Sequence, residues 1–305
     1  MKKNNDITKN QHYVPRLYLR NFCKRKEQIA VFIKSIGNSF FTNIINVANE
    51  NYFYDDEEID KSNQKKQFLE KYFHPLEDRM KNLLKNLLTQ LDSGQFSNFT
   101  DDERIDIAMF IVYQYMRTKE QREIFGQLNQ KLIQIYADEF IKSEGGDPAK
   151  YKVEVDGKYF HTRILLDDKL MDKITLSLYK KLWIILENNT ELPFITSDHP
   201  VTKYGHLGNE FRSMSGFNSK GVEISFPFSP KYLLSIIDEE FAKPMILLDD
   251  KIIQADRQNV LHYNSLQIIH SYNQLYSNIN SFDLAREILS EEPELKNPDH
   301  SRINT

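Results

Sequence analysis

The sequence predicts an α+β protein in which a mixed or antiparallel sheet packs against a subdomain of long helices. Three observations predict this class. Apolar residues recur every three or four positions between about 63 and 142, β-branched runs cluster between about 150 and 276, and another pair of such runs precedes the helices. This segregated order favours α+β over a regular alternation of strands and helices. We therefore expect residues 1–305 to form a single α+β domain with a helical and a strand-rich portion.

The first elements are expected to be a hairpin and an amphipathic helix. Residues 28–34 and 43–48 are β-branched runs on either side of Gly37-Asn38, which is typical of a β-hairpin. Residues 63–92 carry an apolar stripe with helical spacing. Pro75 interrupts this stripe, so the helix either kinks there or a second helix begins at the proline.

A second helical stretch has a clear start and a clear end. Thr100 followed by Glu103 predicts an N-cap, and helical character continues to about residue 142. The glycines and proline of 145–148 end it. Residues 151–165 then alternate around Asp156-Gly157, which predicts another hairpin.

The remainder is expected to be rich in strands. Residues 167–181 predict a short helix, and a closing helix is expected at about 256–276. Between them lie short apolar runs with strand character: 182–187, 193–196, 222–228, 232–237, 245–248 and 251–254.

Composition excludes several classes of protein. The formal net charge of −4 gives no overall attraction to nucleic acid, although residues 1–34 carry nine basic residues against two acidic ones. Cys23 is the single cysteine, so neither an internal disulfide nor a cysteine-based metal site can form. No signal peptide and no membrane-spanning run is recognisable, and we expect a cytoplasmic protein without membrane contact.

The N-terminal segment is the first candidate for a site. Gln11, His12 and Arg16 surround Tyr13-Val14-Pro15 in an otherwise apolar stretch. His12 could act as a general base or metal ligand, and Arg16 could hold a phosphate or carboxylate. The alternative is that His12 caps a turn before the proline while the arginine reaches solvent.

A second candidate lies where an apolar strand ends. Residues 194–195 deliver Thr196, Ser197 and Asp198 into the turn before Pro200. Rigid strand ends aim reactive side chains in many α/β and α+β proteins. The same residue types also form turns for structural reasons alone.

The helices carry two further candidates. Glu77 lies on the apolar face of the first helical stretch, near Glu70 and His74, and a buried carboxylate requires a partner. Gln114 and Arg117 lie one turn apart on the second, apolar helix. Glu70, Glu77 or Asp198 could pair with Arg117, and such a pair could equally be a structural tie between helices.

These residues carry a resemblance to a known family. Residues 11–22, QHYVPRLYLRNF, resemble the opening motif of the domain-of-unknown-function 4238 family. Residues 196–201, TSDHPV, residues 226–230, FPFSP, and residues 114–118, QYMRT, are similar to its later motifs. Phe228 replaces a leucine of the family pattern. The resemblance supports this choice of residues and implies no particular reaction.

The leading hypothesis from the sequence is a phosphodiester hydrolase, a nuclease acting in an antiviral defence or toxin setting. His12, Asp198 and Glu77 would be catalytic, with Mg²⁺ or Mn²⁺ as the expected metal if one takes part. The residues expected to bind substrate are Gln11, Arg16, Gln114, Arg117 and Ser197. The alternatives are a non-catalytic module that binds nucleic acid or a protein, and a buried network with a structural role.

Overall fold

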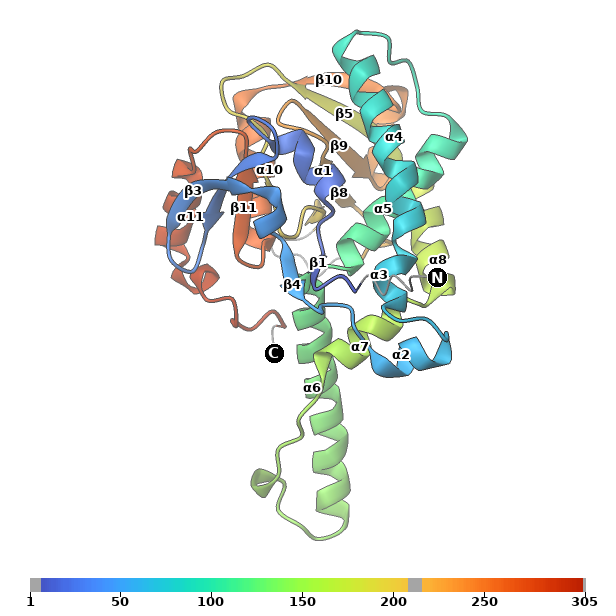
Figure 1. Cartoon of the computed structure of the whole chain (residues 1–305), viewed down its shortest axis with the longest axis vertical. Helices are drawn as coiled ribbons and strands as arrows, with labels where there is room; N and C mark the ends of the chain where they lie inside the picture. The colour runs from blue at the N-terminus through green and yellow to red at the C-terminus, as the bar shows by residue number, and fades with distance from the viewer. Residues whose placement is uncertain (1–6, 208–215, 304–305) are drawn as a thin grey trace, which may run out of the picture.

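The chain folds into sheets flanked by helices, and the predicted α+β class is confirmed (Figure 1). The computed structural model describes residues 7–207 and 216–303, so Lys2 and Lys3 of the basic N-terminal segment lie outside the described residues. Among the described residues, no helix has the length and apolar character needed to cross a membrane.

Most strands belong to two sheets. One has the order β10-β5-β9-β8-β7 and the other the order β3-β2-β11-β6, while β1 and β4 form a separate antiparallel pair. Strand β10 runs parallel to β5, and the other neighbours in both sheets are antiparallel. The strands are β1 Asn10–His12, β2 Gln28–Ile33, β3 Asn38–Asn43, β4 Asn49–Asn51, β5 Leu182–Asn188, β6 Thr196–Ser197, β7 Thr202–Gly205, β8 Val222–Pro227, β9 Tyr232–Ile237, β10 Lys251–Ala255 and β11 Gln274–Ser277.

The helices include two long consecutive ones, α5 and α6. Helix α5 begins with the predicted capping box of Thr100 and Glu103, and it is buried on nearly every side from Ile107 onward. The helices are α1 Arg16–Leu19, α2 Glu57–Ser62, α3 Phe68–Tyr72, α4 His74–Asp92, α5 Asp101–Met116, α6 Lys119–Ser143, α7 Gly157–Ile164, α8 Asp168–Tyr179, α9 Glu239–Ala242, α10 Arg257–His270 and α11 Asp283–Glu291.

The predicted hairpin around Asp156-Gly157 is wrong. Asp156 accepts a hydrogen bond from the backbone N–H of Lys158 and caps helix α7, so the chain turns into a helix here. A Cβ on Gly157 would lie 3.1 Å from the Cα of Gly126 in α6. The glycine therefore permits close packing of α6 and α7. The Asp-Gly pair suggested a hairpin turn, but Asp156 is a helix N-cap and Gly157 is a helix-packing residue.

Four other predicted elements differ in detail. Of the strand expected at 193–196, only Thr196 belongs to a strand, the two-residue β6. Of the hairpin at 28–34 and 43–48, the first strand is confirmed, but its partner is β3, because residues 44–46 form a 3-10 helix. Residues 243–248 form a 3-10 helix instead of a strand. The closing helix ends at His270, because the chain turns there into β11, a central strand of the second sheet.

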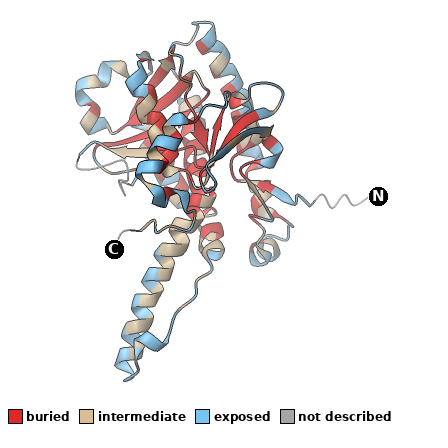
Figure 2. Cartoon of the chain, turned by 90° about the vertical axis from the view of Figure 1, so that its left-hand side faces the viewer, coloured by how far each residue is buried: buried red, intermediate tan, exposed pale blue. Residues whose placement is uncertain are grey.

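Two helix breaks position the candidate site. The helical run of 63–92 divides at Phe73, and Pro75 lies in the first turn of α4. The run of 100–142 divides at Arg117 and Thr118, and Thr118 accepts a hydrogen bond from the backbone of Gln121 as the N-cap of α6. Figure 2 shows buried residues concentrated in the sheets and the helices packed on them, whereas the far part of α6 projects from this body.

Candidate functional site

Arg117 lies at the centre of a network that connects three segments of the chain. Its guanidinium donates to Glu77 Oε1 at 2.7 Å, to the carbonyl of His12 at 2.8 Å and to the hydroxyl of Tyr54 at 3.0 Å. Burial alone would lower the pKa of Arg117, but Tyr54 and Glu77 outweigh burial and raise that pKa. Every nitrogen of this buried cation therefore donates to an acceptor of the protein itself.

Gln11 and His12 join the same network from strand β1. The Gln11 amide donates to Asp55 and accepts from the backbone N–H of Tyr54, both at 2.6 Å. The His12 ring lies half-buried with Nε2 3.4 Å from the carbonyl of Ile44, and burial lowers the pKa of His12 to about 4. The imidazole is thus neutral at pH 7 and contacts protein atoms.

Gln114 and Arg16 contribute less to this network. The Gln114 amide donates to the carbonyl of Tyr13 at 3.0 Å, while its own oxygen is buried without a hydrogen-bond partner. Arg16 begins the short helix α1 and is half-buried, and its charge is one of the lesser factors that lower the pKa of His12.

Ser197 and Asp198 belong to a different set of contacts, at the turn between α10 and β11. Asp198 accepts hydrogen bonds from three consecutive backbone N–H groups, those of residues 272–274, each at 2.8 Å. Burial raises the pKa of Asp198 to about 6, against the opposing effect of these donors and of Lys34. Ser197 donates to Gln267 Oε1 at 2.7 Å. Both side chains tie the strand exit to α10 and β11.

The structure thus brings together four of the sequence-predicted residues and places others elsewhere. Gln11, His12, Glu77 and Arg117 share one network, which Gln114 approaches through Tyr13. The hydrogen bonds of Ser197 and Asp198 go to the α10–β11 region. Across residues 7–207 and 216–303, no group of three or more His, Cys, Asp or Glu side chains could hold a metal ion.

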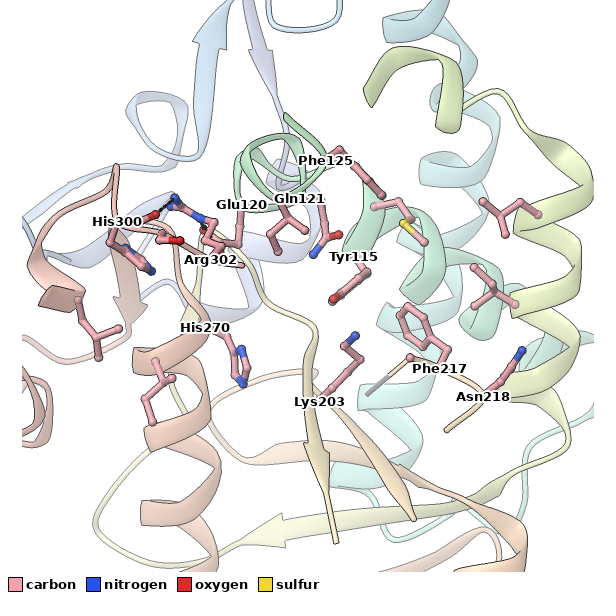
Figure 3. Close-up of a pocket in the computed structure, with 18 of the residues that line it drawn as sticks. Tyr115, Glu120, Gln121, Phe125, Lys203, Phe217, Asn218, His270, His300 and Arg302 are labelled. Atoms are coloured by element: carbon pink, nitrogen blue, oxygen red, sulfur yellow. Dashed lines mark hydrogen bonds and ion pairs between the residues drawn. The ribbon is translucent and has the colours of Figure 1, made fainter. Parts of the chain in front are cut away.

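A cavity of about 750 Å³ lies beside these networks, between helices α5, α6, α8 and α10, strand β7 and the C-terminal segment. Figure 3 shows the side chains of several elements directed into it. Its walls contain aromatic, basic and amide side chains together with aliphatic ones. They include Tyr115, Gln121, Phe125, Lys173, Lys203, Phe217, His270 and Arg302.

The polar groups of this cavity differ in how they are satisfied. Arg302 donates to both oxygens of Glu120, at 2.8 and 2.9 Å, so this ion pair closes one wall. Lys203 Nζ lies 4.8 Å from the ring centre of Tyr115 and 5.4 Å from that of Phe217. The side chain of Gln121 is buried, with a residue exposure of 3%, and its Nε2 has no hydrogen-bond partner. In Figure 3 this amide points into the same space as Tyr115, Lys203 and His270.

The sequence motifs hold the walls of this cavity in place. Thr118, directly after Arg117, bonds His199 Nδ1 through its hydroxyl at 2.7 Å while it caps α6. The His199 ring in turn lies 4.8 Å from that of Tyr115. The QYMRT and TSDHPV segments are thus locked together, and the residues that follow each of them, Gln121 and Lys203, line the cavity.

Sequence reasoning missed these cavity residues for identifiable reasons. Thr118 and Gln121 have the spacing of a helix start, but they lie inside one continuous helical pattern and the break was not recognised. His270 fell in the interior of an expected helix that in fact ends there. Lys203 is an ordinary charged residue in the sequence, and no local signal distinguishes it.

The motifs agree with a comparison against protein families. The family model described as "Protein of unknown function (DUF4238)" matches residues 10–281. The chain belongs to this family. The match covers the networks of Arg117 and Asp198 and most elements of the cavity, but it ends before Arg302. No curated protein and no solved structure matches the chain.

Proposed function

We propose that this DUF4238 protein binds a ligand of nucleotide type, with a phosphate and a planar ring, in the cavity beside α6. The observation that carries the proposal is the buried amide of Gln121, whose Nε2 is directed into the cavity without a partner. An unpaired buried donor costs about 1–3 kcal/mol, so such groups are rare in folded proteins. An acceptor atom of a ligand would remove this cost.

Aromatic side chains favour a planar ring as one part of the ligand. Tyr115, Phe125 and Phe217 line the cavity, and the rings of Tyr115 and Phe217 lie 4.8 Å apart. Ring faces bind nucleobases by stacking, worth about 1–3 kcal/mol per base. The volume of about 750 Å³ lies within the range of about 300–1,000 Å³ that is usual for small-molecule sites.

Basic side chains favour a phosphate as the other part. Lys203 reaches the same space as Gln121. Lys173 on α8 also lines the cavity. A lysine ammonium binds phosphate oxygens as a point charge. The acids of the cavity include Glu120, whose charge is paired with Arg302, and Glu294. The cavity therefore offers cationic groups for a ligand.

The expected nucleic-acid partner fits this site as a terminal nucleotide of a single strand. The overall charge of −4 does not attract a long duplex, whereas a local basic cavity can hold one nucleotide. Recognition of a free nucleotide and of a strand end rests on the same chemistry.

Binding to named probes tests the proposal. Isothermal titration of the full chain with AMP, ATP and short DNA and RNA oligonucleotides should detect at least one of them. Lys203→Met should weaken that binding about 10-fold to 100-fold, because it removes the charge and keeps most of the apolar stem. Lys85→Met, on an exposed face of α4, is the matched control. Failure of every probe to bind would overturn the proposal.

Phosphodiester hydrolysis is a second proposal, favoured by the presence of both His270 and Lys203 in the wall of the cavity. An imidazole can take up a proton, and an ammonium can stabilise charge that develops on a phosphate. The sequence-based assignment to His12, Asp198 and Glu77 is the competing prediction for the same activity.

Incubation with RNA and DNA, with and without Mg²⁺ or Mn²⁺, separates the two assignments. If the cavity is the site, His270→Asn abolishes cleavage while His12→Ala leaves it in place. The opposite result supports the N-terminal assignment. Absence of cleavage under all of these conditions would remove hydrolysis and leave the binding proposal standing.

A further inference from the structure

Helix α6 forms an arm that reaches beyond the rest of the protein. Its 25 residues extend about 37 Å at the usual rise of 1.5 Å per residue. The first turns line the cavity, and the remainder projects from the body together with the segment that returns to α7 (Figures 1 and 2).

One face of this arm carries exposed apolar side chains. Leu128, Leu132 and Ile135 are 40%, 45% and 48% exposed, and Tyr136 beside them is 71% exposed. We call these four residues the arm stripe. Their spacing of four and three residues continues that of Gln121 and Phe125 in the cavity wall, which is the heptad spacing of paired helices. Monomeric proteins seldom expose contiguous apolar surface of this kind.

The opposite face of α6 is already covered by the returning segment. Gln134 accepts from the backbone N–H of Val153, and Gln130 accepts from that of Val155. Gly126 packs against Gly157 on the same side. The returning segment therefore holds α6 in place on one side and leaves Leu128, Leu132 and Tyr136 exposed on the other. Ile135 lies at the edge of the stripe, where it lines a hollow with the returning and C-terminal segments.

We infer that the arm stripe pairs with the arm stripe of a second copy of this chain, with the two helices antiparallel. The choice of a second copy as the partner, and of the antiparallel direction, rests on charge complementarity. Lys131 and Asp138 lie seven residues apart on the edge of the stripe that faces Gln134. One oxygen of Asp138 accepts a hydrogen bond from Gln134 Nε2 at 2.8 Å, and the other oxygen is left for a partner. Antiparallel pairing places Lys131 of each copy opposite Asp138 of the other, so two ion pairs form across the two-fold axis. Parallel pairing would place identical residues at the same level and would form neither ion pair.

The area of the stripe fits such a dimer. Phe140, 66% exposed, adds a second aromatic ring at the edge of the stripe. A buried aromatic ring covers about 150–250 Å², and with three aliphatic residues on each arm the pair would bury on the order of 1,000 Å². This area is at the lower end for specific interfaces, so we expect a dimer that dissociates on dilution.

Sedimentation velocity of the full chain over a dilution series tests the inference. The wild type should pass from dimer to monomer on dilution, and Leu132→Glu should remain monomeric. Because the stripe is exposed, this variant should keep the melting temperature of the monomer, which excludes unfolding as the cause.

Charge reversal identifies the partner as a second copy. Lys131→Asp alone and Asp138→Lys alone should each weaken the dimer about tenfold, because each places like charges opposite one another. The double variant, Lys131→Asp with Asp138→Lys, should restore the dissociation constant of the wild-type dimer. Lys169→Asp, exposed on α8, is the matched control. A monomeric wild type, or a dimer that Leu132→Glu and these reversals leave unchanged, would overturn the inference.

Discussion

The Arg117 network and the α6 cavity are neighbouring polar regions, and they differ in how their groups are satisfied. In the network, the guanidinium of Arg117 donates to Glu77, to Tyr54 and to the carbonyl of His12. In the cavity wall, the Nε2 donor of Gln121 is buried and has no hydrogen-bond partner. A satisfied buried network stabilises one arrangement of the chain, whereas an unsatisfied group facing a cavity is suited to a ligand.

This difference separates two roles that the motifs had seemed to combine. The conspicuous residues of QHYVPRLYLRNF and QYMRT connect β1, α4 and α5. Thr118 then starts α6, and Gln121 follows one turn later in the cavity wall. We therefore expect mutations in the network to change stability and mutations in the cavity to change binding.

The largest expected effect is on stability, at Arg117. Arg117→Ala should lower the free energy of unfolding by about 3–5 kcal/mol, because it leaves Glu77 without its buried partner and removes three hydrogen bonds. Urea denaturation followed by circular dichroism measures this loss. A loss below about 1 kcal/mol, the level of an exposed ion pair, would show that the network is not a structural tie.

Acid should destabilise the fold through His161, a buried histidine beside the network. Its Nε2 lies 2.8 Å from the carbonyl of Met116, and burial together with Arg122 lowers its pKa to about 3. The unfolded chain, with a pKa of about 6.5, binds the proton that the folded chain rejects. The contribution of neutral His161 to the free energy of unfolding is therefore fully present above about pH 6.5. It falls as the pH drops below that value, by up to about 1.4 kcal/mol per pH unit.

Melting temperatures between pH 7.5 and 5 test this dependence. His161→Gln can keep a hydrogen bond to Met116 and cannot take up a proton, so its curve should be flatter than that of the wild type. Equal slopes for the two proteins would assign the acid sensitivity to other groups, such as His12, whose pKa burial also lowers.

The smallest expected change is in the stability of Gln121→Leu. Replacing an unpaired buried amide with an apolar side chain of similar size should leave the free energy of unfolding within about 0.5 kcal/mol or raise it. Chemical denaturation measures it. A loss of more than about 2 kcal/mol would mean that the amide is satisfied in the folded protein and would weaken the case for a ligand.

The sequence predicted the α+β class, the capping box of Thr100 and most strands of the larger sheet, because periodicity and caps are local signals. It did not predict α7, because Asp156-Gly157 suits both a turn and a helix start and the contact of Gly157 with Gly126 decides between them. The sequence indicated an acidic partner for Arg117 among Glu70, Glu77 and Asp198, and in the structure that partner is Glu77.

The cavity itself could not be predicted from local patterns. Gln121, Lys203 and His270 come from α6, β7 and α10, and their meeting depends on how the helices pack around the strand exit. The hydrogen bond of Thr118 to His199, 81 residues apart, is part of that packing and has no counterpart in a local pattern.

The central claim is that a ligand binds in the cavity and that the N-terminal motif supports the fold. Titration of one responding nucleotide probe into wild type, Gln121→Leu and His12→Ala tests it most directly. Because we expect Gln121→Leu to retain the fold, we predict a loss of affinity of about tenfold or more for this variant and wild-type affinity for folded His12→Ala. Wild-type affinity for Gln121→Leu, together with loss of binding in His12→Ala at unchanged melting temperature, would contradict the claim and place the site at the N-terminal segment.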